Sequence, residues 1–135
     1  MTAGYSNTPL ARKLSLKDGM RVWFLDMPDS VRAEIDEYDL TLSEEEVPTP
    51  GLNAAHIFVT DRAEMEKQLG VLRDIIDPAG QVWVSWPKKA AGVETDITED
   101  IIRDVALPMG FVDIKVCAVD ATWSGLKLVI RRELR

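Results

Sequence analysis

The sequence predicts an α/β fold, a Rossmann-like three-layer sandwich whose mostly parallel six-stranded sheet ends in an antiparallel β-hairpin. Three observations predict it. Apolar segments of strand length alternate with amphipathic segments of helix length, which is typical of parallel strands joined by crossover helices. The last two apolar segments, 111–119 and 126–131, are joined by a short turn and must be antiparallel. The length of 135 residues suits one domain, expected over 1–135, with the strand order 2-1-3-4-6-5.

The first half of the chain is expected to supply two helices and three strands. Thr8 is suited to cap a short leading helix and Pro9 to occupy its first position. The segment MRVWFL is nearly all apolar, as expected for a strand covered on both faces. In chain order we expect a helix at 8–14, strand 20–25, helix 29–37, short strand 39–42, a loop at 47–53 and strand 54–60.

In the second half, a capped helix is expected before the strand at 81–86 and another before the strand at 111–119. Asp61 and Glu64 form a capping-box pattern, and Asp96 and Glu99 repeat it. Proline and glycine end each helix, at 78–80 and 108–110, ahead of the strands at 81–86 and 111–119.

Composition excludes several classes of function. The formal charge is −7 without a basic stripe, so we expect no nucleic-acid partner. No apolar run approaches the roughly 20 residues that span a bilayer, and the first residues lack the apolar core of a signal peptide. A single cysteine, Cys117, is compatible with the reducing cytoplasm, where we expect the protein. The basic residues near the N-terminus, at 12, 13, 17 and 21, are interpreted as solvated surface.

The turn after the first strand lacks glycine. Rossmann-type enzymes carry a glycine-rich turn there, which lets the backbone approach the cofactor. This chain has LDMPDS at 25–30 instead. We therefore expect no cofactor, with S-adenosylmethionine (SAM) considered but disfavoured.

Two resemblances add to this interpretation. A sheet that closes with a hairpin, preceded by the segment DPAGQVWV, resembles the class I SAM-dependent methyltransferase fold, although the chain is too short for the full set of strands. The segments GYSNTPL, WPKK and TWSGLKLVIR resemble an uncharacterised family of short bacterial proteins, in which a glycine is usual where Asn7 stands here. The first resemblance implies the architecture, and neither implies a mechanism.

A ligand of an open parallel sheet binds beyond the carboxyl ends of its strands. Eight residues are expected to converge at that edge, and we take them as candidate ligand-binding residues: Asp26, Lys88, Lys89, Thr95, Asp96, Thr122, Trp123 and Ser124. The two lysines would clamp an anion, and Trp123 would stack on a ring between two hydroxyls. Each also has a structural interpretation, as solvated charges, a hairpin packing residue, helix caps or a turn residue.

The other candidate residues predict no reaction. His56, expected near the amino end of its strand, is interpreted as a hydrogen-bonded histidine in the core or at the end of the sheet. No second histidine or cysteine cluster accompanies it to form a metal site. The sequence therefore favours a non-catalytic binding or regulatory domain that takes a small anion or nucleotide. A divergent SAM-dependent methyltransferase or other group-transfer enzyme is the first alternative, and a protein-interaction module without a small ligand is the second.

Overall fold

The fold is a three-layer sandwich, and the computed structural model describes it for residues 8–135. The helices are α1 (Leu10–Lys13), α2 (Asp29–Asp36), α3 (Arg62–Ile75) and α4 (Glu99–Ala106). The strands are β1 (Arg21–Leu25), β2 (Ser43–Glu45), β3 (Leu52–Phe58), β4 (Ile76–Pro87), β5 (Phe111–Ala118) and β6 (Trp123–Ile130). Short 3-10 turns lie at η1 (Lys89–Ala91), η2 (Leu107–Met109) and η3 (Arg132–Leu134).

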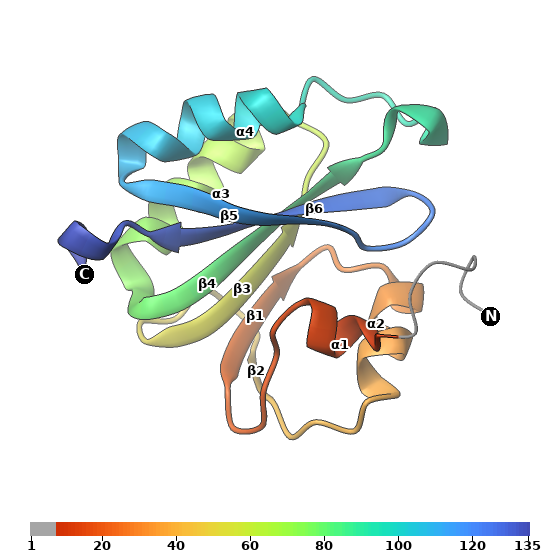
Figure 1. The fold of residues 1–135 in the computed structure, drawn as a ribbon, viewed down its shortest axis with the longest axis vertical. Helices are drawn as coiled ribbons and strands as arrows, with labels where there is room; N and C mark the ends of the chain where they lie inside the picture. Colours follow the sequence, from red (N-terminus) through yellow and green to blue (C-terminus); the bar gives the residue numbers. More distant parts are fainter. Residues whose placement is uncertain (1–7) are drawn as a thin grey trace.

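The sheet has the predicted topology. Its order is β2-β1-β3-β4-β6-β5, and the first four of these strands run parallel. Strand β6 runs antiparallel to both β4 and β5, so the hairpin at the end of the chain is confirmed. In Figure 1, α3 and α4 lie on one side of the sheet and α1 and α2 on the other.

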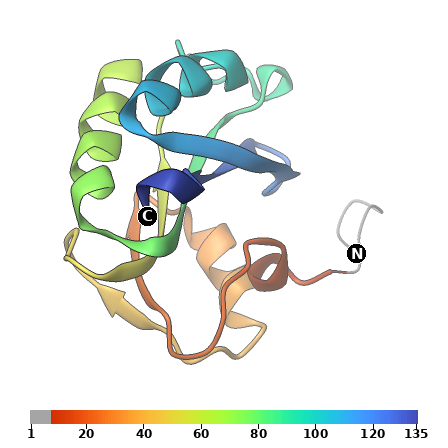
Figure 2. The same cartoon turned by 60° about the vertical axis from the view of Figure 1, so that its left-hand side comes forward.

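Two apolar layers hold the helices to the sheet. On the α3 and α4 side, Met65, Leu72 and Ile102 pack with sheet residues such as Ile57 and Leu126. On the α1 and α2 side the layer is smaller, and its members include Leu14, Val22, Val31, Phe58 and Trp83. The turned view in Figure 2 shows α3 and α4 along one face of the sheet. Burial on both faces explains why the central strands are nearly continuous apolar runs.

Helix α1 is shorter than the predicted helix at 8–14. Pro9, rather than Thr8, holds the N-cap position, and no side chain caps the helix. Ser15 takes a left-handed conformation with φ +58°. The amide of Ser15 donates to the Arg12 carbonyl and the amide of Leu16 to the Ala11 carbonyl, which ends the helix.

The predicted strand at 39–42 is wrong, because that stretch has no regular secondary structure. Asp39 has φ +54°, and the amide of Thr41 donates to the Asp18 carboxylate at 2.7 Å. Strand β2 follows at 43–45 and pairs with only the first half of β1. Its sequence, SEE, has none of the apolar character that marks a buried strand, since β2 lies at the edge of the sheet.

Strand β4 begins earlier than predicted, directly where α3 ends. It includes Pro78 and Gly80, which the sequence indicated as a helix stop and turn. A Cβ atom on Gly80 would lie 2.9 Å from the backbone oxygens of both Asn53 and Asp77. Glycine therefore allows β4 to pass close to β3, where the register between the two strands shifts.

One of the sequence motifs is only partly described. Residues 4–7 of GYSNTPL, Asn7 included, lie outside the described residues.

Among residues 8–135, no helix combines the length and the apolar character that crossing a membrane requires.

Candidate functional site

The candidate residues lie at or next to strand ends at the carboxyl edge of the sheet. Asp26 follows β1, Lys88 and Lys89 follow β4, and Thr122 leads into β6. Thr95 and Asp96 lie in the loop before α4, beside the end of β3. The parallel register of β1, β3 and β4 brings these strand ends to one edge, as the sequence predicted.

Asp26 forms the turn from β1 into α2. It is exposed and takes a left-handed conformation with φ +53°, which aspartate tolerates better than most residues. Pro28 then holds the N-cap position of α2, and no side chain caps that helix. Among the described residues, the Asp26 carboxylate has no hydrogen bond or ion pair. The chain thus makes a left-handed turn here without glycine.

A backbone contact joins the β4 end to the hairpin turn. The amide of Lys88 donates to the carbonyl of Thr122 at 2.7 Å. Asp120 shapes the turn, because its Oδ1 accepts from the amides of Thr122 at 2.8 Å and Trp123 at 2.7 Å. The sequence did not single out Asp120 as a contact residue, although an aspartate at the start of a turn is a signal for this arrangement.

Trp123 packs against the sheet. Its ring lies edge-to-face on Phe58, with the ring centroids 5.2 Å apart, and the side chain is half-buried. Ser124 is also half-buried and pairs with Trp86 on β4 and Ala118 on β5. The structural interpretation of Trp123 as a hairpin packing residue accounts for the contact seen.

Thr95 and Asp96 bind the end of β3 and the start of α3. The Thr95 hydroxyl donates to the Thr60 carbonyl at 2.7 Å, and Asp96 Oδ1 accepts from the Arg62 amide at 2.8 Å.

The prediction that Asp96 caps the helix after it is wrong. Thr98 caps α4, accepting from the Ile101 amide at 3.2 Å, while Asp96 satisfies the first amide of α3. The predicted cap of α3 is confirmed, since Asp61 accepts from the Glu64 amide at 3.0 Å.

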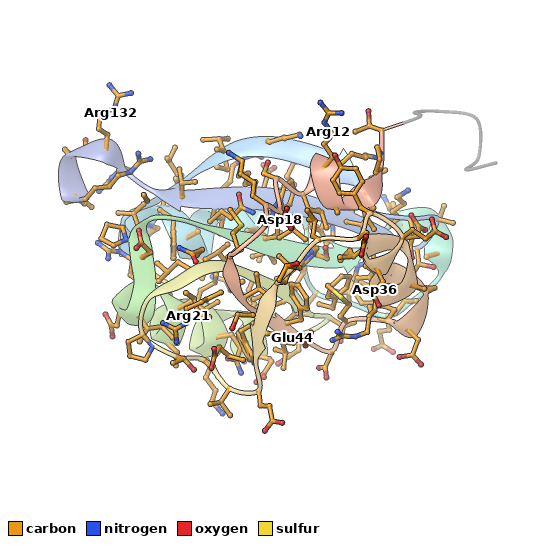
Figure 3. All side chains as sticks on the ribbon, turned by 90° about the horizontal axis from the view of Figure 1, so that it is seen from below. Arg12, Asp18, Arg21, Asp36, Glu44 and Arg132 are labelled. Carbon is orange, nitrogen blue, oxygen red and sulfur yellow. The ribbon has the colours of Figure 1, made fainter. Side chains whose placement is uncertain are left out.

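A small hollow that the sequence did not predict lies between β1, α2 and β2. It has a volume of about 130 Å³ and is lined by apolar side chains that include Phe24, Met27 and Ile35. Arg32 lines it too, and its guanidinium donates to both Glu44 carboxylate oxygens at 2.7 and 2.9 Å. The bond to Glu44, more than the opposing burial, raises the pKa of Arg32. Glu44 on β2 and Asp36 at the end of α2 also line the hollow, and both are labelled in Figure 3.

His56 is a buried, hydrogen-bonded histidine as interpreted, but it does not lie near the amino end of its strand. Strand β3 begins at Leu52, which moves His56 past the middle of the strand. The ring stacks on Phe58 at 4.3 Å, and its Nε2 atom is 2.6 Å from the Ser85 hydroxyl. Burial lowers the pKa of His56 to about 3, so the imidazole is neutral near pH 7. Within residues 8–135, no three His, Cys, Asp or Glu side chains are grouped to hold a metal ion.

Comparisons with known proteins identify the fold. No family model and no curated protein matches the sequence. The chain is similar in structure to PigF with SAH (TM-score 0.60, 9% identity, 91% of this chain and 61% of that one) and to a SAM-dependent methyltransferase from Aquifex aeolicus (0.59, 16%, 90% and 87%). It is also similar to fibrillarin from Aeropyrum pernix with natively bound SAM (0.52, 11%, 93% and 70%). The chain therefore has the class I SAM-dependent methyltransferase fold, as the resemblance implied, and spans about 61% of the PigF chain.

These structures correct the expectation that the chain takes no cofactor. The sequence disfavoured SAM because the first turn lacks glycine. Structures of the same fold hold SAH and SAM, which points toward SAM instead of no cofactor. The physical reason for the error lies in Asp26, whose φ of +53° gives the turn a left-handed residue without glycine.

Proposed function

We propose that this chain binds SAM at the carboxyl edge of its sheet and acts as a divergent methyltransferase-type domain. The left-handed turn at Asp26 is the observation that carries the proposal. It directs the backbone from β1 into α2 at the place where proteins of this architecture bind their nucleotide cofactors. The similarity to methyltransferase structures supports group transfer more than the non-catalytic role that the sequence favoured.

The residues at this turn fit the chemical groups of SAM. The exposed Asp26 carboxylate has no partner among the described residues, and it would accept from the ammonium group or a ribose hydroxyl. The first amides of α2, which no side chain caps, would donate to the cofactor's carboxylate. The negative charge of the Asp26 carboxylate would also favour the positively charged sulfonium of SAM.

Bound SAM would supply an electrophilic methyl group on its sulfonium. The residues of this chain would bind and orient the reactants rather than remove a proton through histidine. The single histidine is His56, which is buried and neutral. The catalytic contribution in this proposal is therefore proximity and orientation.

The two lysines at the same edge suit an acceptor with a negative group. Lys88 is held beside Thr122 by a 2.7 Å backbone hydrogen bond, and Lys89 is exposed at the start of η1. We therefore propose that the methyl acceptor is a small anion. Sulfate, as a simple probe, should shift the amide resonances around Lys88 and Thr122, and Lys88→Ala with Lys89→Ala should remove those shifts. Unchanged resonances at high sulfate would contradict the anionic acceptor but not SAM binding.

Calorimetry with SAM and with SAH tests the cofactor proposal. Asp26→Asn keeps a residue that tolerates the left-handed turn but removes the negative charge, so the Kd for SAM should rise about tenfold. Asp74→Asn is the matched control, because Asp74 is exposed near the C-terminal end of α3, away from the carboxyl edge of the sheet. Equal Kd values for wild type and Asp26→Asn would reject the role of Asp26, and no binding of either ligand at millimolar concentration would reject the proposal.

A further inference from the structure

A second hollow lies at the opposite, amino edge of the sheet. It has a volume of about 520 Å³ and opens between the end of α1, β4 and β6. Its polar lining comes from Arg12, Ser15, Lys17, Tyr38, Gln81 and Lys127, and we call it the cationic hollow. Figure 3 views this end of the molecule, with Arg12 on α1 and Asp18 on the loop that follows it.

The cations of this hollow lack carboxylate partners. Arg12, Lys17 and Lys127 form no ion pair within the described part of the chain, and neither do their neighbours Lys13 and Lys115. The last two donate to backbone carbonyls instead, Lys13 to Ala118 at 3.2 Å and Lys115 to Lys13 at 3.0 Å. The chain carries a net charge of −7, so acidic residues are plentiful elsewhere. Gathering unpaired like charges costs stability, which an anion in the hollow would offset.

Lys127 is the centre of this arrangement. Its ammonium lies 3.1 Å from the Ser15 hydroxyl, and the side chain is half-buried. Burial, and then the charges of Lys115 and Lys17, lower the pKa of Lys127. The ammonium is therefore held where its own charge is disfavoured. Ser15 has φ +58°, at a helix end where glycine is the usual residue, and serine there brings a hydroxyl to Lys127.

We infer that the cationic hollow binds a small organic phosphate, at a site separate from the carboxyl edge. The guanidinium of Arg12 and the ammonium groups of Lys17 and Lys127 are charged hydrogen-bond donors of the kind that bind phosphate. Leu16 and Met20 supply apolar surface in the same lining for the organic part of the ligand. The volume of about 520 Å³ lies in the range of small-molecule sites, roughly 300–1,000 Å³, and exceeds what a phosphate ion alone needs.

Calorimetry and thermal unfolding with ADP and with inorganic pyrophosphate test the inference. ADP should bind saturably and more tightly than pyrophosphate, because only ADP has an organic part. Lys17→Ala should raise the Kd for ADP about tenfold, the expected loss for one charge-assisted bond. Lys67→Ala on α3 is the matched control, since Lys67 is exposed and distant from the hollow in the fold, and it should leave the Kd unchanged.

Lys127→Met separates a binding role from a structural one. Since it removes a charge from the unpaired cluster, the ligand-free variant should unfold at the wild-type temperature or above, and ADP should no longer raise that temperature. A fall in the ligand-free unfolding temperature with the ADP response kept would overturn the inference. So would equal affinity for ADP and pyrophosphate, or an ADP affinity unaffected by Lys17→Ala. None of these results depends on SAM, whose binding at the other edge is measured separately.

Discussion

The Nε2 atom of His56 on β3 lies 2.6 Å from the Oγ atom of Ser85 on β4, and both side chains are buried. This hydrogen bond places the chain's single imidazole inside the apolar layer beneath α1 and α2. Its consequences concern the stability of the sheet, because neither group is open to solvent.

Stability should fall in acid through His56. Burial lowers its folded-state pKa from 6.5 to about 3. Below the ordinary pKa the unfolded chain binds a proton that the folded protein does not bind, so the unfolded state is favoured. The contribution is present above about pH 6.5 and is lost as the pH falls toward 3. Urea unfolding across this range measures it, and His56→Gln should reduce the slope. An imidazole that titrates near pH 6.5 in the folded protein would contradict this account.

Ser85→Ala should destabilise the protein by about 1–3 kcal/mol, because it leaves a buried imidazole nitrogen without its partner. Ser124→Ala is the matched control on the neighbouring β6, because the Ser124 hydroxyl makes no hydrogen bond within residues 8–135. That control should change stability by less than about 0.5 kcal/mol. Denaturant unfolding of both variants is the measurement, and equal effects would show that the His56 contact contributes nothing.

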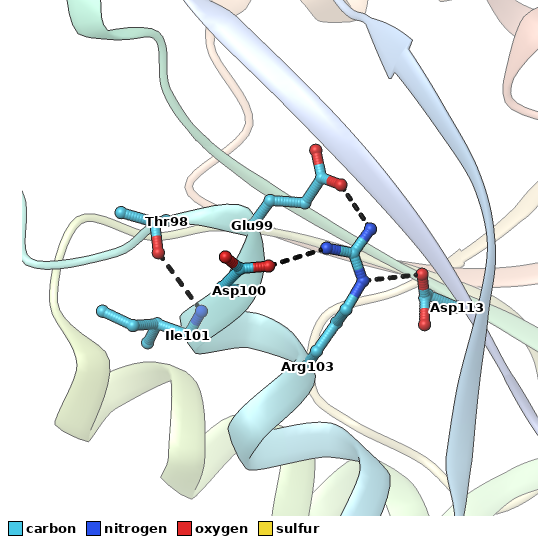
Figure 4. A network of polar contacts seen from close by, with 6 residues as sticks. All are labelled: Thr98, Glu99, Asp100, Ile101, Arg103 and Asp113. Carbon is cyan, nitrogen blue, oxygen red and sulfur yellow. Dashed lines mark hydrogen bonds and ion pairs between the residues drawn. The ribbon is translucent and has the colours of Figure 1, made fainter.

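Arg103 joins the start of α4 to β5 through three carboxylates, as Figure 4 shows. Its Nε donates to Asp113 at 2.9 Å, and its terminal nitrogens bind Asp100 at 3.0 Å and Glu99. The bonds to Asp113 first and Glu99 second raise the pKa of Arg103. Arg103→Met should lower the unfolding temperature by a few degrees, and less in high salt, which screens exposed charges. Arg62→Met loses only the pair with Glu66 and should have a smaller effect; equal effects would exclude a role for the network.

Trp123→Ala distinguishes packing from ligand stacking. Because the ring is half-buried and contacts Phe58, we expect a loss of about 2–3 kcal/mol without any ligand, below the usual cost for a fully buried tryptophan. Thermal or urea unfolding of the ligand-free protein measures this. Unchanged stability would favour Trp123 as a platform for a bound ring.

The sheet order could be predicted because apolar segments of strand length alternate regularly with amphipathic helical segments along the chain. The alternation of strands and helices fixes parallel neighbours, and the short turn before β6 fixes the antiparallel pair. Prediction failed where tertiary contacts act against local signals. Strand β2 is polar and forms through its pairing with β1. Pro78 and Gly80 indicate a turn in the sequence, but both lie within β4.

The carboxyl edge could also be predicted, since parallel strands end together, but its contacts could not. Asp96 binds the Arg62 amide, 34 residues away, through loop geometry that no periodicity records. The left-handed Asp26 is equally invisible, because aspartate tolerates several backbone conformations. The cationic hollow brings together residues from α1 to β6. In the sequence, Arg12 and Lys17 were interpreted as solvated surface near the N-terminus, and Lys127 was not singled out as a site residue.

The most direct test of the central claim, that SAM binds at the carboxyl edge, is a titration of ¹⁵N-labelled protein with SAH followed by amide resonances. Saturable shifts should centre on 26–30, at the turn into α2, and should leave the amides of the cationic hollow around Ser15 and Lys17 unchanged. Spectra without saturable shifts at millimolar SAH, or shifts confined to the amino edge, would contradict the claim.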